Sequence, residues 1–548
     1  VLGKMQNHGS STLKHHSYTL EFTSNPAWYA VQALPYLMEY PHDCAEQIFS
    51  RIYANSLASH IANANPKIQQ VFNSWKETES DALVSNLEKN QKLKALLLEE
   101  TPWVLQANDE SERKKRVGLL FDLNKMSGEY ASNVNKLLEM QMPSGAFPWF
   151  DGMRENRYIT QHIINGFGKL DALGVEKIRS DNRLWNAIKK AIQFLDEEIR
   201  DDYEDLKKRK NVDLSKNHID NIQVHYLYMR SFFKDIEVAS NAQKAFDYYK
   251  SQIEEYWTDF GIYQKGLVAL ALNRFGYDTI PNDIVKSLKE FALEDEEMGS
   301  YFKYDRGYYW HQAPIETQAL MIEVFEEVAQ DQPMVEDLKV WLLKQKQTQD
   351  WKTTKATVEA IYALLRRGSD MLTNTKMAEI KLGGKNLDLS TTKAEEGTGY
   401  FQKSWAADEM DDSMAEISVN NPNDNVAWGA VYWQYFEQLE KITFAETPLS
   451  LKKQLFKEIK SDTGKKIEPL AADISLNPGD KVTVRIELRV DRAMDYVHMK
   501  DMRAACFEPT NVISQYKYQD GLGYYQSTKD ASTNFFMDRL NPGTYVFE

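Results

Sequence analysis

The stretch Tyr40-Pro-His-Asp-Cys-Ala-Glu-Gln-Ile-Phe-Ser-Arg-Ile-Tyr53 carries both a helix start and a thiol. Pro41 stiffens the preceding turn, Asp43 can cap a helix that starts at Cys44, and Glu46 follows that cap by three residues, as in a capping box. We therefore expect a helix whose first turn holds a thiol. Apolar residues recur after it at steps of three and four and predict one buried stripe, made of Ile48, Phe49, Ile52, Tyr53, Leu57 and Ile61.

Cys44 and Gln47 have a spacing that suits covalent chemistry. The positive end of the helix dipole favours a thiolate, and residues three apart share one helix face. A thiolate that attacks the Gln47 carboxamide and expels ammonia leaves an internal thioester, which is far more electrophilic than an amide. The commoner arrangement in proteins is a buried cysteine beside an unrelated glutamine, so the rest of the chain must support the assignment.

Composition limits the classes of protein to which the chain can belong. Its 548 residues are expected to form several domains, and a hydrophobic content of 42% is enough for large cores. A net charge of −15 disfavours nucleic acid and anionic membrane as partners. Cys44 and Cys506 are too few for a disulfide framework. No apolar run approaches the roughly 18 residues of a membrane-spanning helix.

Helical patterns fill the chain from Trp28 to about residue 368, after a strand at Tyr18-Thr-Leu-Glu-Phe22. Within this region a loop of the form Gly-x-aromatic recurs before helices, at Gly145, Gly261 and Gly299. The spacing suits stacked helical hairpins that bury their faces against neighbours. We expect these hairpins to close into an α/α toroid.

Strand patterns return after residue 368. The β-prone segment Val426–Phe436 is expected to pair with the strand near Tyr18, so that one β domain contains the helices as an insertion. A further region, clearest at Lys481–Val490, alternates like a strand of a sandwich. The last residues, Gly543–Glu548, resemble a strand cut short, and we expect the chain to be a fragment.

Cys-x-Glu-Gln after Tyr-Pro resembles the thioester signature of the alpha-2-macroglobulin and complement family, in its bacterial branch. The resemblance implies a thioester between Cys44 and Gln47, with Pro41, Asp43 and Glu46 supporting the motif. Three segments near the chain end resemble the final sandwich domain of bacterial macroglobulins: Phe507-Glu-Pro509, Gly521-Leu-Gly523 and Ala531–Phe536.

The order of elements also resembles the C-terminal part of a macroglobulin. It implies a CUB-type β domain at 1–30 and 369–445, interrupted by a toroidal thioester domain at 31–368. A macroglobulin-type β-sandwich, expected to be truncated, follows at 446–548.

The resemblance implies a protease inhibitor of the cell envelope or periplasm, not an enzyme, with no cofactor. Its partners would be target proteases, held by a covalent amide link, and the other macroglobulin domains of the full-length chain. In complement-like relatives a downstream histidine directs the acyl group to hydroxyls. Thr160 occupies that place here, and His162 is expected on another helix face. We therefore expect lysine amines as targets.

Other chemistries remain open at this point. Cys44 with His42, His60 or His162 has the composition of a cysteine-protease pair. A toroid also suits a carbohydrate-active enzyme, a glycosidase or lyase, and a structural or adhesive module is a further alternative. The histidines show no His-Glu-x-x-His pattern, so a metal site is not expected. The candidate acid and base of a glycosidase are Asp151, Asp305, Glu316 and Asp350.

Overall fold

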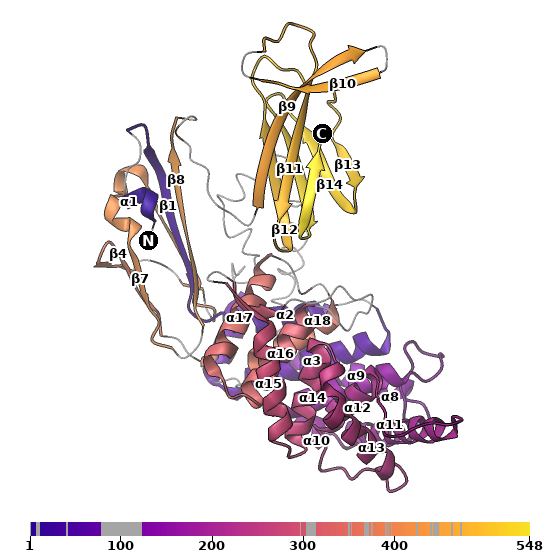
Figure 1. Cartoon of the computed structure of the whole chain (residues 1–548). Helices are drawn as coiled ribbons and strands as arrows, with labels where there is room; N and C mark the ends of the chain where they lie inside the picture. The colour runs from indigo at the N-terminus through magenta and orange to yellow at the C-terminus, as the bar shows by residue number, and fades with distance from the viewer. Residues whose placement is uncertain are drawn as a thin grey trace. The chain divides into compact units, whose positions relative to one another are not determined.

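The computed structural model divides the chain into two compact units, Val1–Phe436 and Glu437–Glu548 (Figure 1). Both contain antiparallel sheets, and the first also contains all of the described α-helices, so the expected mixture of helix and sheet is confirmed. The residues that the structure describes are 2–6, 11–39, 42–77, 123–295, 298–302, 314–348, 351, 353–366, 372–373, 376–389, 392, 394–395, 397–423, 426–438, 441, 449–461, 464–471 and 474–548.

Six helices of the first unit, called the inner helices below, follow one another in a closed circuit of contacts. α3 packs on α9, α9 on α12, α12 on α14, α14 on α16, α16 on α18, and α18 returns to α3. They are buried over most of their surface, as helices with apolar residues on every side must be. The inner helices are α3 (Ala45–Ala64), α9 (Arg157–Ala172), α12 (Asn221–Arg230), α14 (Ile262–Arg274), α16 (Pro314–Glu327) and α18 (Thr354–Leu365).

The inner helices are backed by further helices, most of which expose one face. For example, α8 packs on α3, α11 on α9, α15 on α14 and α17 on α16. The apolar residues of both sets form one continuous core. These further helices are α2 (Trp28–Glu39), α4 (Pro66–Glu77), α8 (Leu123–Met140), α10 (Lys177–Ser180), α11 (Asn182–Lys208), α13 (Gln243–Tyr256), α15 (Thr279–Phe291) and α17 (Gln332–Thr348).

A three-stranded sheet joins the two ends of the helical region. β1 (Lys14–Thr23) lies between β6 (Phe401–Ala406) and β8 (Trp428–Phe436), antiparallel to both, with Thr19 opposite Ser404 and Tyr432. The predicted pairing of Val426–Phe436 with the strand near Tyr18 is therefore present. A second small sheet packs against the first and consists of β4 (Glu379–Leu382), β5 (Lys385–Asn386) and β7 (Ile417–Asn420).

The strand β1 is more buried than its alternating sequence predicts. Every residue from Ser17 to Thr23 is buried, not only the apolar ones. The polar side is satisfied by hydrogen bonds: Glu21 accepts from the hydroxyls of Tyr400 (3.1 Å) and Tyr432 (2.8 Å). Alternating apolar and polar residues usually indicate a half-buried strand. β1 differs because it is the central strand of its sheet and its polar side chains have partners.

The second unit contains two four-stranded antiparallel sheets around one apolar core. The order of one sheet is β10-β9-β11-β16 and that of the other is β12-β15-β14-β13. The expected final strand is present as β16, paired with β11. The strands are β9 (Leu449–Ser461), β10 (Gly464–Pro469), β11 (Val482–Val490), β12 (Met494–Met502), β13 (Gln515–Gln519), β14 (Leu522–Thr528), β15 (Ser532–Leu540) and β16 (Gly543–Phe547).

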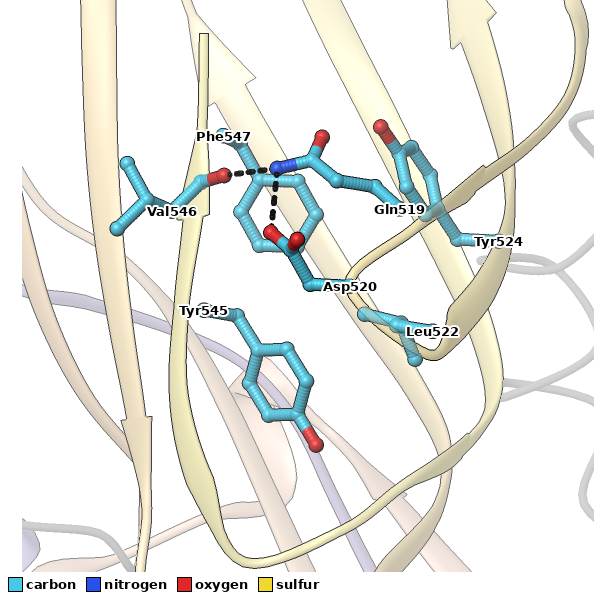
Figure 2. A pocket seen from close by; sticks show the side chains of 7 residues that line it. All are labelled: Gln519, Asp520, Leu522, Tyr524, Tyr545, Val546 and Phe547. Carbon is cyan, nitrogen blue, oxygen red and sulfur yellow. Dashed lines mark hydrogen bonds between the residues drawn. The ribbon is translucent and has the colours of Figure 1, made fainter.

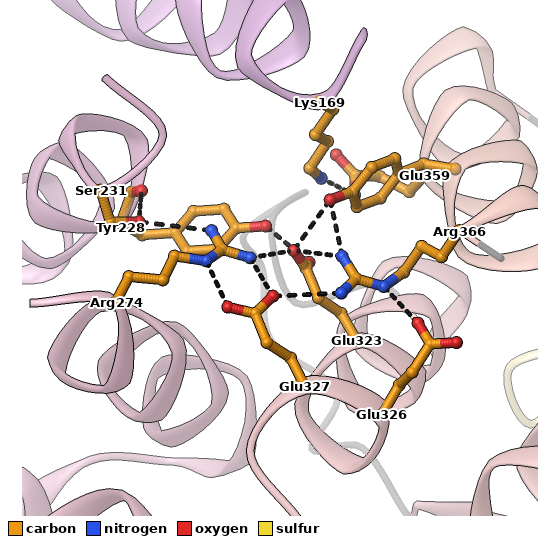
Figure 3. Close-up of polar contacts among 10 residues, drawn as sticks. Lys169, Tyr228, Ser231, Arg274, Glu323, Glu326, Glu327, Glu359 and Arg366 are labelled. Carbon is orange, nitrogen blue, oxygen red and sulfur yellow. Dashed lines mark hydrogen bonds and ion pairs between the residues drawn. The ribbon is translucent and has the colours of Figure 1, made fainter. Parts of the chain in front are cut away.

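Buried charges connect the inner helices at one place in the helical core (Figure 3). Glu323 on α16 is 1% exposed and accepts hydrogen bonds from Arg274 of α14 (2.6 Å), Arg366 at the end of α18 (3.1 Å) and the Tyr228 hydroxyl of α12 (2.6 Å). Both arginines also pair with Glu327 (2.7 and 3.1 Å). Further members of this network are Lys169, Ser231, Glu326, Glu359 and Tyr362.

The recurrent Gly-x-aromatic loops have a steric cause at Gly145 and Gly299. Both have a positive φ, +96° and +68°, and a Cβ at either would overlap a carbonyl oxygen of a surrounding helix, Lys190 of α11 or Asp337 of α17. Gly261 is instead the N-cap of α14. Gly299-Ser-Tyr301 does not lead directly into a helix as expected, because it forms the strand β3 (Gly299–Phe302) against β2 (Ala292–Asp295).

Gly145→Ala is expected to destabilise the helical unit by about 2–4 kcal/mol. Alanine is strained in the left-handed conformation that Gly145 adopts, and its Cβ would clash with the Lys190 carbonyl. Gly152 lies in the same loop with φ +75°, but open space surrounds its Cα. Gly152→Ala should therefore cost only about 1 kcal/mol. Denaturant unfolding followed by circular dichroism measures both changes, and equal losses would contradict the steric explanation.

Candidate functional site

Cys44 stands at the N-cap of α3, with φ −83° and ψ 158°, and is 5% exposed with a free thiol. The helix begins one residue later than expected, at Ala45, whose N–H donates to the carbonyl of Trp149 (2.9 Å). The predicted stripe is confirmed: its six members, from Ile48 to Ile61, are at most 2% exposed. The thiol therefore lies at the start of a helix whose apolar stripe is buried in the core of the first unit.

Asp43 does not cap this helix, which is a correction to the sequence prediction. The N-cap position of α3 is occupied by Cys44, one residue after Asp43. The Asp43 carboxylate is instead paired with Lys136 (3.0 Å) and Arg51, and these contacts lower its pKa. Arg51 also donates to the carbonyl of His42 (2.9 Å), so it holds the segment that leads into Cys44. Pro41 lies outside the described residues.

The protonation of Cys44 differs from the expected thiolate. Burial raises the pKa of the thiol, although backbone N–H groups of Gln47 and Glu46 form hydrogen bonds that lower it. The charge of Glu46 raises it further. The N–H groups at the helix start therefore lower the pKa of the thiol, as predicted. Desolvation raises it by more and favours the neutral thiol.

Gln47 follows Cys44 in the first turn of α3. Its backbone N–H lowers the pKa of the Cys44 thiol, and its carboxamide oxygen Oε1 is buried without a hydrogen-bond partner. A buried carbonyl oxygen without a donor is unusual in a folded protein. The first turn of α3 thus contains a buried thiol and a carboxamide whose oxygen accepts no hydrogen bond from the described residues.

Glu46 does not complete a capping box. Its Oε1 accepts hydrogen bonds from Ser50 one turn later (3.1 Å) and from Thr354 at the start of α18 (2.7 Å). Burial raises its pKa, although these hydrogen bonds and the charge of Lys355 lower it. Glu46 therefore links two inner helices.

Thr160 is fully buried on α9. Its hydroxyl accepts from the N–H of Phe147 (2.9 Å) and donates to the carbonyl of Asn156 (2.8 Å). Phe147 belongs to the same loop as Trp149, whose carbonyl receives Ala45 N–H. The position expected for a complement-type histidine is thus joined to the start of α3 by this loop, and it carries a hydroxyl group.

His162 packs elsewhere in the core. Its ring stacks with Tyr158 (6.4 Å between centroids) and meets Phe49 edge-on (6.0 Å). Burial and the nearby charge of Lys355 hold its pKa well below the usual range, so it is neutral. Of the other two histidines considered with Cys44, His42 is exposed and burial lowers the pKa of His60.

The carboxylates considered for a glycosidase do not form a pair in the described structure. Asp151 is exposed in the loop before α9, whereas Glu316 is 3% exposed in the first turn of α16, with its Oε1 3.8 Å from Lys355 Nζ. Asp305 and Asp350 lie outside the described residues. An inverting or retaining mechanism requires two carboxylates facing one accessible bond, which Asp151 and Glu316 do not provide.

Three contacts at the site were missed from sequence. Ser50 follows Glu46 by four residues, so its contact with Glu46 could have been predicted from helical spacing. Thr354 and the Trp149 carbonyl reach the first turn of α3 from distant positions, and no local pattern reveals them.

The second unit contains a small hollow beside the β13–β14 turn (Figure 2). Gln519 crosses it and donates to the carbonyl of Val546 (2.7 Å). The hollow has a cavity volume of about 10 Å³, room for about one water molecule and far less than the roughly 300–1,000 Å³ of small-molecule sites. Its lining consists of Gln519, Asp520, Leu522, Tyr524, Tyr545, Val546 and Phe547.

Within the described ranges, no three His, Cys, Asp or Glu side chains are grouped so that they could hold a metal ion. No helix in this part of the chain has the length and apolar character needed to cross a membrane.

Three of the solved structures that resemble the chain are of alpha-2-macroglobulin from Escherichia coli. Native alpha-2-macroglobulin spanning domain MG7 to the C-terminus matches with a TM-score of 0.38 and 12% identity, over 98% of this chain and 73% of that one. The cryo-EM native conformation matches at 0.39 and 13%, over 98% and 29%. The trypsin-activated protein matches at 0.43 and 14%, over 97% and 31%. This chain thus spans less than a third of the two longer proteins.

A family comparison identifies the second unit. Residues 449–548, which form β9 to β16, match the bacterial alpha-2-macroglobulin MG10 domain. No curated protein matches the chain as a whole sequence. The assignment of the second unit rests on this domain match alone, because the structural matches have TM-scores below 0.5. On this evidence residues 449–548 form a domain of the bacterial alpha-2-macroglobulin MG10 type.

Proposed function

We propose that the chain is the thioester-bearing C-terminal part of a bacterial alpha-2-macroglobulin-like protease inhibitor. The proposal makes the chain part of an inhibitor and not of a catalyst, and the MG10 match of residues 449–548 supports it. In this proposal the Cys44–Gln47 thioester captures amines of an attacking protease. The observation that carries it is the first turn of α3, where a buried free thiol precedes Gln47 by three residues and the Gln47 carboxamide oxygen is buried without a hydrogen-bond partner.

The bond is formed by an exchange within this turn. Cys44 Sγ attacks Gln47 Cδ, the C–N bond of the carboxamide breaks, and the departing nitrogen takes the thiol proton and leaves as ammonia. An amine later attacks the same carbon, forms an amide with Gln47 and restores the Cys44 thiol. The raised pKa of Cys44 makes the thiol weakly reactive until it is deprotonated.

The domain assignment is part of the proposal. The inner helices and their surrounding helices would form an α/α toroid at 31–368, inserted in a CUB-type domain at 1–30 and 369–445. The closed circuit of helix contacts and the pairing of β1 with β6 and β8 support it. The macroglobulin-type sandwich would occupy 446–548, where the MG10 match lies.

Location and partners follow from the family only as proposals. We place the parent protein in the cell envelope, where it would meet proteases. The other macroglobulin domains of a longer chain would be its intramolecular partners, and an amide link to a lysine would hold the protease.

Methylamine and glycerol, offered together, test the proposed target. Thr160 cannot form an acyl-imidazole, so nothing at that position relays the acyl group to a hydroxyl. We expect methylamine to add to Gln47 and to release one additional titratable thiol, with little glycerol adduct. Peptide mass spectrometry locates the adduct and thiol titration counts the release. Predominant glycerol adducts would contradict amine targeting, and no adduct with no released thiol would contradict the thioester.

A further inference from the structure

The side chain of Glu46 ties the proposed thioester turn to a second inner helix. Glu46 lies between Cys44 and Gln47 in sequence, and its Oε1 accepts from Thr354 Oγ1 at 2.7 Å and from Ser50 Oγ at 3.1 Å. Ser50 belongs to α3 itself and moves with it. Thr354 belongs to α18, so its hydrogen bond fixes the turn relative to the rest of the ring of helices.

Thr354 is placed to reach α3 because its neighbour performs the capping. Thr353 is the N-cap of α18 and its side chain accepts from the N–H of Ala356 (3.0 Å). Thr354 follows as the first helical residue, is 7% exposed, and has its hydroxyl directed at Glu46. Two adjacent threonines therefore have different tasks, one within α18 and one between helices.

The position of Glu46 affects both reacting groups. Gln47 is its direct neighbour, and the backbone N–H of Glu46 lowers the pKa of the Cys44 thiol. Burial raises the pKa of the Cys44 thiol and the Glu46 charge raises it further. A rotated first turn would therefore change the distance from sulfur to carboxamide and also the charge near the sulfur.

We infer that Thr354 is a positioning residue for thioester formation, acting through its hydrogen bond to Glu46. This inference rests on the proposed function. Attack by sulfur on a neighbouring carbon depends steeply on geometry, and a misplacement of about 1 Å is enough for a loss on the order of 100-fold in rate. Thr354 touches neither reacting group, so its effect is indirect.

The test compares Thr354→Val, which removes the hydroxyl at nearly constant volume, with Thr354→Ser, which retains it. We expect Thr354→Val to form the thioester at least about tenfold more slowly, whereas Thr354→Ser stays close to wild type. The readout is the fraction of newly folded protein that has lost one ammonia, followed over time by intact mass. Thr357→Val is the matched control, because Thr357 is a buried threonine of the same helix whose hydroxyl bonds only to the carbonyls of Trp351 and Thr353.

A second comparison separates positioning from general destabilisation. In a Glu46→Ala background, Thr354→Val should cause no further loss, since its partner is gone. Thr354→Ala serves as the second hydroxyl-free variant if the valine variant does not fold, and melting by circular dichroism verifies folding of each protein. A normal ammonia loss in folded Thr354→Val or Thr354→Ala overturns the inference alone. Wild-type protein that never loses ammonia overturns the proposed function and this inference with it.

Discussion

Cys44→Ala is expected to abolish every sign of the thioester. Wild-type protein should be lighter than its sequence mass by one ammonia molecule, and the variant should have its full sequence mass. The reason is that alanine offers no nucleophile to the Gln47 carboxamide. Intact mass spectrometry measures the difference, and methylamine should add to wild-type protein but not to the variant.

Cys506→Ala is the matched control for this change. Cys506 is also a free cysteine, but it is exposed and lies in the second unit. Its substitution should leave the loss of ammonia and the methylamine adduct unchanged. Cys44→Ala should fold, because the helix start is also held by the Ala45 N–H bond to the Trp149 carbonyl and by the contacts of Arg51 with Asp43 and the His42 carbonyl. A persistent loss of ammonia in Cys44→Ala would end the proposal.

Glu323→Gln is expected to lower the stability of the helical unit by about 3–5 kcal/mol, the usual cost of leaving a buried charge without its partner. Glu323 is 1% exposed and accepts hydrogen bonds from Arg274 and Arg366. The neutral amide of glutamine removes the negative charge that balances the buried guanidinium groups of Arg274 and Arg366. Denaturant unfolding measures the loss. Glu204→Gln removes an exposed pair with Lys207 and should change stability by less than about 1 kcal/mol.

The same carboxylate predicts a dependence on pH. Burial alone would raise the pKa of Glu323, but the charges of Arg274, Arg366 and Lys169, with the hydrogen bond from Tyr228, lower it to about 2. An unfolded glutamate titrates near about 4.3. The folded state therefore binds this proton less readily, so the contribution of Glu323 is complete above about pH 5 and is lost as the pH falls towards 2. Wild-type stability should fall over this range more steeply than that of Glu323→Gln, and parallel curves would contradict the assignment.

Local patterns predicted the parts of the structure that depend on local spacing. The buried stripe of α3 follows from residues three and four apart, and the alternation of Lys481–Val490 gives the strand β11. The pairing of β8 with β1 was predicted from β propensity and element order, although it crosses the whole helical region.

The sequence could not supply the long-range polar contacts of the site. Asp43 looks like a cap in isolation, but Lys136, which is 93 residues away, competes for its carboxylate together with Arg51. Glu46 similarly looks like half of a capping box until Thr354 is brought beside it. The pKa of Cys44 was misjudged because burial, which depends on all the surrounding packing, exceeds the effect of the helix start.

The placement of β1 between β6 and β8 has a consequence for biosynthesis. Thr19 and Ser404, which share a hydrogen bond in the finished sheet, are 385 residues apart in sequence. At translation rates of about 5–20 residues per second, β1 waits on the order of 20–80 s for its first partner strand. During that interval the most buried strand of the sheet has both edges unpaired, a state that invites association with other nascent chains. A chaperone that covers residues 14–23 until translation passes residue 436 would increase the yield of folded protein.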